Sequence, residues 1–340
     1  MNIIITGGCG FIGSNLCFFL KKKIKNARIV SVDNFSKSYS YYNSKRLLKS
    51  GIKNYKVDIS STKSLSKISF KADLIIDCSA EPAVETSRIN TSKVLNSNLV
   101  GTINILEKCK IDKSKIIFLS SSRIYPVRES YKKFKEFKNK KKTSLYDEDT
   151  SILGPKTIYG YTKLASEMLV EEYSYCYDVD YIINRFGLIT GEGQFGKVEQ
   201  GLISLWLWRH YRKIPLEYKG HGGKGEQIRD VLFVDDLNNL ILKQIISFNK
   251  IKNQIFCAGG GTKNIISLAN LTKMCQNITG NKITITSNKD TSIYDIPYYV
   301  SSLKKINKFY KWKPKQKMNK GLIKIFNWMK KNNNQIKYFF

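Results

Sequence analysis

The chain has 340 residues, of which 42% are hydrophobic and 12% aromatic, which excludes a disordered or low-complexity protein and predicts one large α/β unit or a core domain with a smaller lobe. Lysine and arginine total 58 against 27 aspartates and glutamates, a formal charge of +31 that raises the question of nucleic-acid binding. Because the excess is nearly all lysine spread along the chain, we interpret it as a solvated coat that would attract anionic nucleotides, and we expect no nucleic-acid partner.

Short β-branched segments alternate with helical patterns through the first half of the chain. The predicted strands carry apolar residues on both faces, which predicts a buried parallel sheet. The helices between them give the βαβ alternation of a Rossmann-like, doubly wound α/β fold. In such a fold, ligands bind at the carboxyl ends of the strands. The predicted helices include Thr91 to Lys110 and Tyr159 to Tyr175, and the predicted strands are Asn2 to Thr6, Arg28 to Asp33, Tyr55 to Asp58, Ala72 to Cys78, Lys115 to Ser120 and Tyr181 to Asn184.

A glycine-rich loop follows the first strand and opens a helix. Its glycines have the spacing G-x-x-G-x-x-G. Glycine lets the backbone turn tightly and approach a pyrophosphate, while the amino terminus of the helix supplies N–H donors and a positive dipole. Taken alone, the loop is also compatible with a structural tight turn. The residues assigned to a cofactor here are Gly7, Gly10, Phe11, Ile12 and Gly13.

Asp33 ends the second strand, twenty residues after Gly13. A carboxylate at this place binds the ribose 2′-hydroxyl of NAD and repels the 2′-phosphate of NADP. Loop, helix and carboxylate together predict NAD as the cofactor, and Asn34 is assigned to the same site. Asp58, at the end of the third strand, is predicted to contact adenine, although a turn cap explains it nearly as well.

A tyrosine and a lysine lie four residues apart at the start of a predicted helix, and so on one face of it. These are Tyr159 and Lys163. A phenol with a pKa of about 10 is a poor base at neutral pH, so a nearby ammonium is needed to favour the phenolate. Ser120, Ser121 and Ser122 follow a predicted strand at its carboxyl end, where a hydroxyl can hold a reacting sugar oxygen. A solvated helix face and ordinary turn serines remain the alternatives.

From Gly187 the chain changes to glycine-rich loops interleaved with aromatic and basic residues, which predicts a substrate lobe. Val231 to Asp236 and Gln254 to Ala258 are predicted to return to the sheet. We therefore expect an NAD-binding domain over 1–186, completed by about 228–260, and a smaller, discontinuous α/β nucleotide-sugar-binding lobe over 187–227 and 261–340. The lysine-dense stretch Tyr131 to Lys142 is predicted to be an exposed loop or a short helix.

The glycine-rich loop with Ser121, Tyr159 and Lys163 resembles the fingerprint and catalytic triad of the extended short-chain dehydrogenase/reductase family, and the resemblance runs essentially end to end. It implies that Ser121, Tyr159 and Lys163 are catalytic and that the last two also touch NAD. It further implies that Asp58 and Ile59 flank adenine, that Ala80 lines the cofactor, that Asn98 supports the active-site helix, and that Ser120 contacts the nicotinamide ribose.

The two residues after the catalytic serine bear on the reaction type. In the 4,6-dehydratases of this family an acidic pair follows the catalytic hydroxyl residue, whereas this chain has Ser122 and Arg123. Elimination needs a proton acceptor and a proton donor in place. A dehydratase or an acid-dependent decarboxylase is therefore disfavoured.

Several segments of the second lobe resemble the CDP-paratose (CDP-tyvelose) 2-epimerase branch of the family. They are Asn184 to Gly187, Gly191 to Gly196, Gln200-Gly201, Gly223 to Asp230 and Asp295 to Tyr299. The resemblance implies transient oxidation of a sugar carbinol to a ketone, rotation of the ketosugar and return of hydride to its other face. Arg229 would clamp the pyrophosphate, its alternative being a surface ion pair with Asp230. The residues assigned to the substrate are Ser122, Arg123, Gln194, Phe195, Gln200, Arg229 and Tyr299.

One position departs from that branch. Relatives usually carry an arginine three residues before the aspartate at 295, whereas this chain has Ser292, for which Lys289 is a candidate substitute. The sugar nucleotide is therefore open, and a UDP-sugar 4-epimerase with the same triad is an alternative. A second alternative is a Rossmann-fold scaffold or RNA-binding protein that keeps NAD without catalysis, which the lysine coat favours and the retained triad opposes.

The remaining features concern location and assembly. Met1 leads directly into the first strand without a basic leader, and apolar runs such as Leu202 to Trp208 are far shorter than the ~20 residues of a membrane span. We expect a cytoplasmic protein with no membrane partner. Seven widely spaced cysteines and two histidines support neither a disulfide framework nor a metal site. Homodimers are usual in the family, so we expect a homodimer.

Overall fold

The computed structural model describes residues 1–82, 89–140, 143–197 and 200–340 in two compact units, each of which is treated by itself below. Unit 1 comprises Met1–Ile124, Thr157–Arg185 and Asn238–Phe256; unit 2 comprises Tyr125–Lys156, Phe186–Leu237 and Cys257–Phe340. Residues 125–156, 186, 228–237 and 257–260, which the sequence analysis assigned to the NAD-binding domain, thus belong to unit 2.

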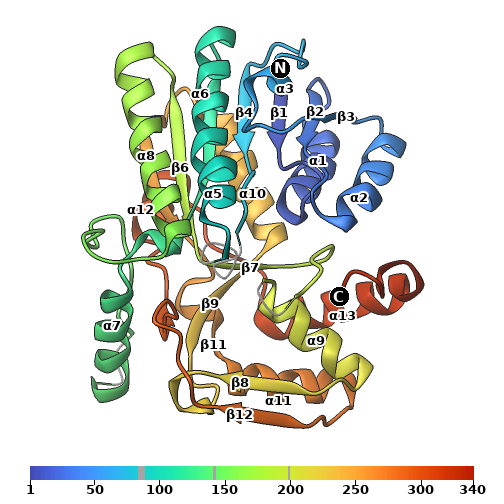
Figure 1. Cartoon of the computed structure of the whole chain (residues 1–340), viewed down its shortest axis with the longest axis vertical. Helices are drawn as coiled ribbons and strands as arrows, with labels where there is room; N and C mark the ends of the chain where they lie inside the picture. Colours follow the sequence, from blue (N-terminus) through green and yellow to red (C-terminus); the bar gives the residue numbers. More distant parts are fainter. Residues whose placement is uncertain (83–88, 141–142, 198–199) are drawn as a thin grey trace. The chain divides into compact units, whose positions relative to one another are not determined.

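A seven-stranded sheet forms the framework of unit 1, with the strand order β10-β6-β5-β4-β1-β2-β3 (Figure 1). The pairs of β1 with β2 and β4, of β2 with β3 and of β4 with β5 are all parallel. This confirms the predicted Rossmann-like α/β fold. The strands are β1 (Asn2–Thr6), β2 (Arg28–Asp33), β3 (Lys53–Lys56), β4 (Leu74–Asp77), β5 (Lys115–Ser121), β6 (Tyr181–Phe186) and β10 (Gln254–Ala258).

Helices flank this sheet and bury apolar side chains against it. One core cluster joins strand residues such as Ile4, Ile75 and Ile116 to Ile105 of α6 and Val170 of α8. The predicted helix Thr91 to Lys110 forms as three consecutive segments, because a π-helical turn at Asn96–Val100 separates α5 from α6. The helices are α1 (Phe11–Lys23), α2 (Ser38–Lys49), α3 (Thr62–Leu65), α5 (Thr91–Leu95), α6 (Gly101–Asp112), α8 (Ile158–Tyr177) and α10 (Val234–Ser247).

Unit 2 contains two small sheets. In the first, β9 pairs with β11, β13 and β7, and in the second β12 pairs with β8. The strands are β7 (Leu188–Thr190), β8 (Leu216–Lys219), β9 (Ile228–Phe233), β11 (Ile265–Ser267), β12 (Ile285–Asn288) and β13 (Tyr298–Tyr299). The helices are α7 (Val127–Lys140), α9 (Leu202–Arg212), α11 (Leu268–Thr279), α12 (Lys304–Tyr310) and α13 (Met318–Ile336).

One local prediction requires correction. The predicted return of Val231 to Asp236 to the main sheet is wrong, since β9 belongs to the first sheet of unit 2 and ends at Phe233. Asp235 and Asp236 instead lie in the first turn of α10, where the helix dipole favours negative charge. For the stretch Tyr131 to Lys142, predicted to be an exposed loop or a short helix, the helix is confirmed up to Lys140, since α7 covers these residues. Its last two residues lie outside the described part of the chain.

Among the described residues, no helix combines the length and the apolar character that crossing a bilayer requires.

Candidate active site

The glycine-rich loop connects β1 to α1 in a shape that only glycine allows. Gly7 has a φ of +58°, and a Cβ there would lie 2.9 Å from the carbonyl oxygen of Cys78. A Cβ at Gly13 would lie 2.2 Å from the carbonyl oxygen of Gly7, so the helix packs directly on the loop. Gly10 is the N-cap residue and has no side chain to occupy the helix end, whose first N–H groups lack intrahelical partners. This cradle fits the pyrophosphate of NAD.

Asp33 joins the end of β2 to this loop. Its Oδ2 accepts the N–H of Cys9 at 3.0 Å, and its Oδ1 accepts the N–H of Phe35 at 2.8 Å. Burial raises the pKa of the Asp33 carboxyl, while these two amide donors lower it. The carboxylate therefore stands at the carboxyl end of a strand beside the cradle, and its contact with a ribose hydroxyl of NAD stays a prediction.

The residues predicted to lie around adenine are brought together in part. Asn34 Nδ2 donates to Asp58 Oδ2 at 3.3 Å. Although burial raises the pKa of Asp58, hydrogen bonds from Ser60 and Asn34 bring it below its usual value. The Ser60 N–H donates to Asp58 Oδ1 at 2.9 Å, so the turn cap that the sequence analysis kept open is present. The side chain of Ile59 packs against Gly101. Contact of Asp58 or Ile59 with adenine stays a prediction.

Ser121 and Tyr159 meet at the carboxyl end of β5. Thr157 caps α8 by accepting the N–H of Gly160 at 2.9 Å. A Cβ at Gly160 would lie 2.1 Å from the carbonyl oxygen of Arg123, so this glycine lets the first turn of α8 approach the strand end. Burial raises the pKa of Tyr159, while a hydrogen bond with the Ser121 side chain and the charge of Arg123 lower it.

Lys163 lies one turn further along α8 and is buried. Its Nζ lies 4.1 Å from the centroid of the Phe118 ring on β5. Burial lowers the pKa of Lys163, whereas the negative charges of Asp77 and Glu167 raise it. Tyr159 is 8% exposed and Lys163 3%, so the alternative of a solvated helix face is wrong. The pair instead lies inside unit 1, and the positive charge that lowers the pKa of Tyr159 there is that of Arg123.

Asn98, in the π-helical turn, connects α8 with the segment that follows β4. Its Nδ2 donates to Thr162 Oγ1 at 3.2 Å, and its Oδ1 accepts the N–H of Glu81 at 2.7 Å. The second contact fixes the backbone next to Ala80. Such π-helical turns occur frequently at functional sites. These are the contacts that a supporting role for Asn98 requires, and the contact of Ala80 with NAD stays a prediction.

A buried network behind the triad escaped the sequence analysis. Ser120 Oγ donates to Glu167 Oε1, and an Arg185 guanidinium nitrogen lies 2.8 Å from Glu167 Oε2. These two charged side chains are 5% and 1% exposed. Glu167 comes four residues after Lys163, on the same helix face, which was a usable signal. Arg185 comes from β6, and no spacing along the chain points to it.

The assigned substrate residues fall in both units. Ser122 and Arg123 belong to unit 1, in a short 3₁₀ turn directly after β5, and the Arg123 N–H donates to Ser121 Oγ at 3.2 Å. The others belong to unit 2. There, Gln194 Oε1 accepts hydrogen bonds from Thr190 and Ser204 at 2.9 and 2.8 Å. The Gln194 side chain thus connects the end of β7 to the first turn of α9.

Two assigned aromatic residues of unit 2 are engaged in packing. Phe195 lies against Phe339, with ring centroids 4.9 Å apart. Tyr299 is 1% exposed and packs on Tyr146, with ring centroids 4.8 Å apart. Gln200 is exposed and pairs with Lys197 through the backbone. A substrate contact of Gln194, Phe195, Gln200 or Tyr299 stays a prediction.

Arg229 lies on β9 and forms its ion pair with Asp295, not with the adjacent Asp230. Its guanidinium donates to the carbonyl oxygens of Ile228 and Ile296 and lies 3.9 Å from Asp295 Oδ1. Successive residues of a strand point to opposite faces. Asp230 accordingly points into the interior, where its Oδ2 accepts the N–H of Gly261 at 2.8 Å.

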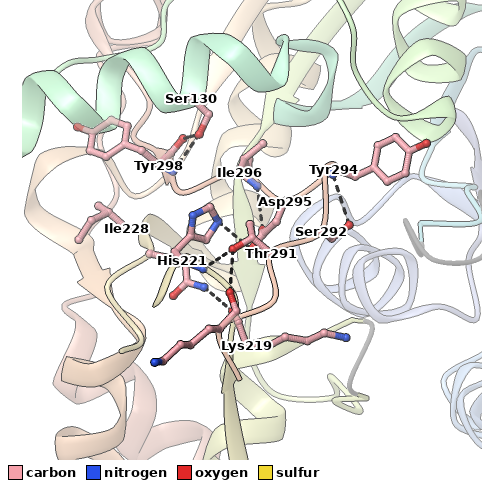
Figure 2. Close-up of polar contacts among 12 residues, drawn as sticks. Ser130, Lys219, His221, Ile228, Thr291, Ser292, Tyr294, Asp295, Ile296 and Tyr298 are labelled. Carbon is pink, nitrogen blue, oxygen red and sulfur yellow. Dashed lines mark hydrogen bonds and ion pairs between the residues drawn. The ribbon is translucent and has the colours of Figure 1, made fainter. Parts of the chain in front are cut away.

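Figure 2 shows the loop that carries Ser292 and Asp295 in unit 2. His221 Nε2 lies 3.1 Å from Asp295 Oδ2, and the His221 N–H donates to Thr291 Oγ1 at 2.7 Å. Ser292 Oγ accepts the N–H of Tyr294 at 3.4 Å. At the position where relatives usually carry an arginine, Ser292 therefore accepts a hydrogen bond from the backbone of its own loop.

Comparison with protein families and known proteins places this geometry in context. A family model described as "NAD dependent epimerase/dehydratase family" matches residues 3–259. CDP-paratose 2-epimerase of Salmonella typhi is 27% identical over 96% of this chain and 99% of its own length. UDP-glucuronate 4-epimerase of Thermodesulfobacterium geofontis is also 27% identical, over 98% of both chains.

Solved structures share the fold. The UDP-glucose 4-epimerase of Thermotoga maritima, determined with UDP-glucose, superposes with a TM-score of 0.83 at 24% identity, over 98% of this chain and 100% of that one. The UDP-glucuronic acid 4-epimerase of Bacillus cereus, in complex with UDP-glucuronic acid and NAD, gives a TM-score of 0.82 at 24% identity, over 97% and 99% of the two chains.

Proposed function

The chain belongs to the NAD dependent epimerase/dehydratase family, and on that premise we propose that it is an epimerase that inverts one carbon of a nucleotide-linked sugar. The observation that carries this proposal is the burial of Tyr159 and Lys163 on one face of α8, with Lys163 over Phe118 of β5 and Ser121 at the end of that strand. No acidic residue follows the serine at 122 or 123, so the residues that an elimination would need are missing from those two positions.

NAD is the cofactor of this family, and when bound it supplies a reversible hydride acceptor. Gly7 to Gly13 and the start of α1 would hold its pyrophosphate, and Asp33 its adenosine ribose. Tyr159 takes the proton of the reacting sugar hydroxyl, because the nearby Lys163 ammonium favours its phenolate form. Ser121 positions the same sugar oxygen by hydrogen bonding.

The cofactor preference can be tested directly. NAD is expected to bind at least tenfold more tightly than NADP, a difference of about 1.4 kcal/mol or more. The reason is that the charge of the Asp33 carboxylate, whose ionised form is favoured by working at pH 8, would face the 2′-phosphate of NADP. Dissociation constants for both cofactors, measured by titration calorimetry at that pH, check this. Equal dissociation constants for NAD and NADP would mean that Asp33 does not contact the adenosine ribose.

The substrate that we propose is a CDP-linked sugar, with inversion at C2 as in CDP-paratose 2-epimerase. The near full-length similarity to that enzyme supports this choice, together with the segments of the second lobe that the sequence analysis singled out. Arg229 of unit 2 is the proposed pyrophosphate ligand, since a guanidinium can bind phosphate oxygens through two N–H groups. A UDP-sugar 4-epimerase is the second candidate, which equal identity to a UDP-glucuronate 4-epimerase favours.

A panel experiment distinguishes these candidates. CDP-, UDP-, GDP- and dTDP-sugars are incubated with the NAD-loaded protein, and epimers are followed by NMR, first in water and then in D₂O. We expect inversion without net NADH and without deuterium at the inverted carbon, because hydride leaves and returns at one carbon. Deuterium at that carbon would instead show deprotonation next to a carbonyl, and the mechanism proposed here would have to be abandoned.

A further inference from the structure

Three side chains lie side by side on neighbouring strands of unit 1, next to Lys163. Thr6 of β1 is in register with Asp77 of β4, and Asp77 is in register with Phe118 of β5. Residues paired in register point to the same face of a sheet. Lys163 Nζ lies above the Phe118 ring on this face, 4.1 Å from its centroid. Asp77 and Lys163 thus share one buried environment.

Asp77 is only partly satisfied by hydrogen bonds. It is 1% exposed, and its Oδ1 accepts bonds from the Thr6 hydroxyl and, at 3.1 Å, from the N–H of Ser79. Its Oδ2 is buried and has no hydrogen-bond partner within the part of the chain that the structure describes. The nearby Thr102 hydroxyl, which lowers the pKa of Asp77, donates to the carbonyl oxygen of Asn98. A buried carboxylate is costly unless a positive charge balances it.

Lys163 is also near a second carboxylate, but that one is already balanced. Glu167 binds the Arg185 guanidinium at 2.8 Å and accepts the Ser120 hydroxyl. Asp77 forms no direct ion pair in residues 1–82, 89–140, 143–197 or 200–340, and the positive charge that lowers its pKa is that of Lys163. By elimination, Asp77 is the carboxylate whose charge is available to Lys163.

We propose that Asp77 is a positioning residue that keeps Lys163 in its ammonium form beside Tyr159. This proposal rests on the proposed function, because that function gives Tyr159 and Lys163 their catalytic roles. Burial lowers the pKa of Lys163 and raises the pKa of Asp77, and the charge of each group opposes the shift of the other. The other titratable or charged groups around the pair are Cys78 after β4, Cys109 of α6, Tyr159 and Glu167 of α8, Arg185 of β6 and Arg123.

The test measures the Lys163 amine itself in the full-length, NAD-loaded protein. Asp77→Asn removes the charge but keeps an oxygen that can accept from Thr6 and Ser79. Lysine is labelled at ¹³Cε, and the Lys163 NMR signal is identified by its absence from Lys163→Arg. We expect the Asp77→Asn substitution to lower the Lys163 titration midpoint by about 1 pH unit or more, as for loss of a close opposite charge. The alkaline limb of the kcat–pH profile should move the same way.

Thr6→Val is the matched control, because it removes a hydrogen bond to Asp77 and leaves the charge. It is expected to leave the Lys163 midpoint well above that of Asp77→Asn. An unchanged midpoint in Asp77→Asn, or equal shifts in both variants, overturns the proposal.

A further measurement keeps the proposal falsifiable. Should Asp77→Asn not fold, a Lys163 midpoint below pH 7 in the unsubstituted protein would equally overturn the proposal, and a midpoint above pH 7 supports it. The NMR titration needs no sugar substrate. Failure of every nucleotide sugar in the panel would therefore reject the proposed function without deciding the role of Asp77.

Discussion

Replacing Tyr159 with phenylalanine is expected to lower kcat by about 10²- to 10⁴-fold, the range for loss of general base catalysis, while NAD stays bound. The ring is 8% exposed and keeps its packing in the variant, so only the hydroxyl that contacts Ser121 is lost. Turnover of the preferred nucleotide sugar and NAD affinity by calorimetry are the two measurements.

Tyr161→Phe is the matched control for this substitution. Tyr161 lies on the same helix but is 49% exposed, so removing its hydroxyl should leave kcat within about twofold of the original. A Tyr159→Phe enzyme as active as Tyr161→Phe would mean that another group takes the substrate proton.

Glu167→Gln is expected to destabilise the protein by about 3 to 5 kcal/mol, as for a buried ion pair that loses one partner. The Arg185 guanidinium would then stay buried, 5% exposed, without its carboxylate. Equilibrium urea denaturation, followed by circular dichroism, measures the change in the free energy of unfolding.

Glu226→Gln supplies the comparison, since it breaks an ion pair with Lys138 whose side chains are 44% and 49% exposed. Exposed pairs contribute about 0 to 1 kcal/mol. If both substitutions cost the same, the Glu167–Arg185 pair does not stabilise the fold in the way that its burial implies.

Features that depend on local pattern were predicted well from the sequence. β1 and β2 form at the predicted residues because each is a short β-branched run. The loop after β1 needs glycine at positions 7 and 13 because a Cβ at either position would collide with backbone atoms. The four-residue spacing of Tyr159 and Lys163 likewise predicted their shared face on α8.

Features that depend on contacts between distant segments were not predicted. Asp77 and Glu167 were overlooked because their partners, Thr6 and Arg185, come from other strands. The alternative partner suggested for Arg229 was its neighbour in sequence, whereas the strand directs these two side chains to opposite faces. Glycine-rich segments such as that around Phe195 carry no periodicity, so nothing in them indicates which side chains pack inward.

The π-helical turn at Asn96–Val100 sets the rotation of one helical segment against the next. It holds one residue more than an α-helical turn, and one residue of an α-helix corresponds to about 100° of rotation. Without that extra residue, α5 and α6 could not keep their present faces toward α8 at the same time. The bond from Asn98 to Thr162 thus depends on the number of residues in this turn as much as on which residues they are.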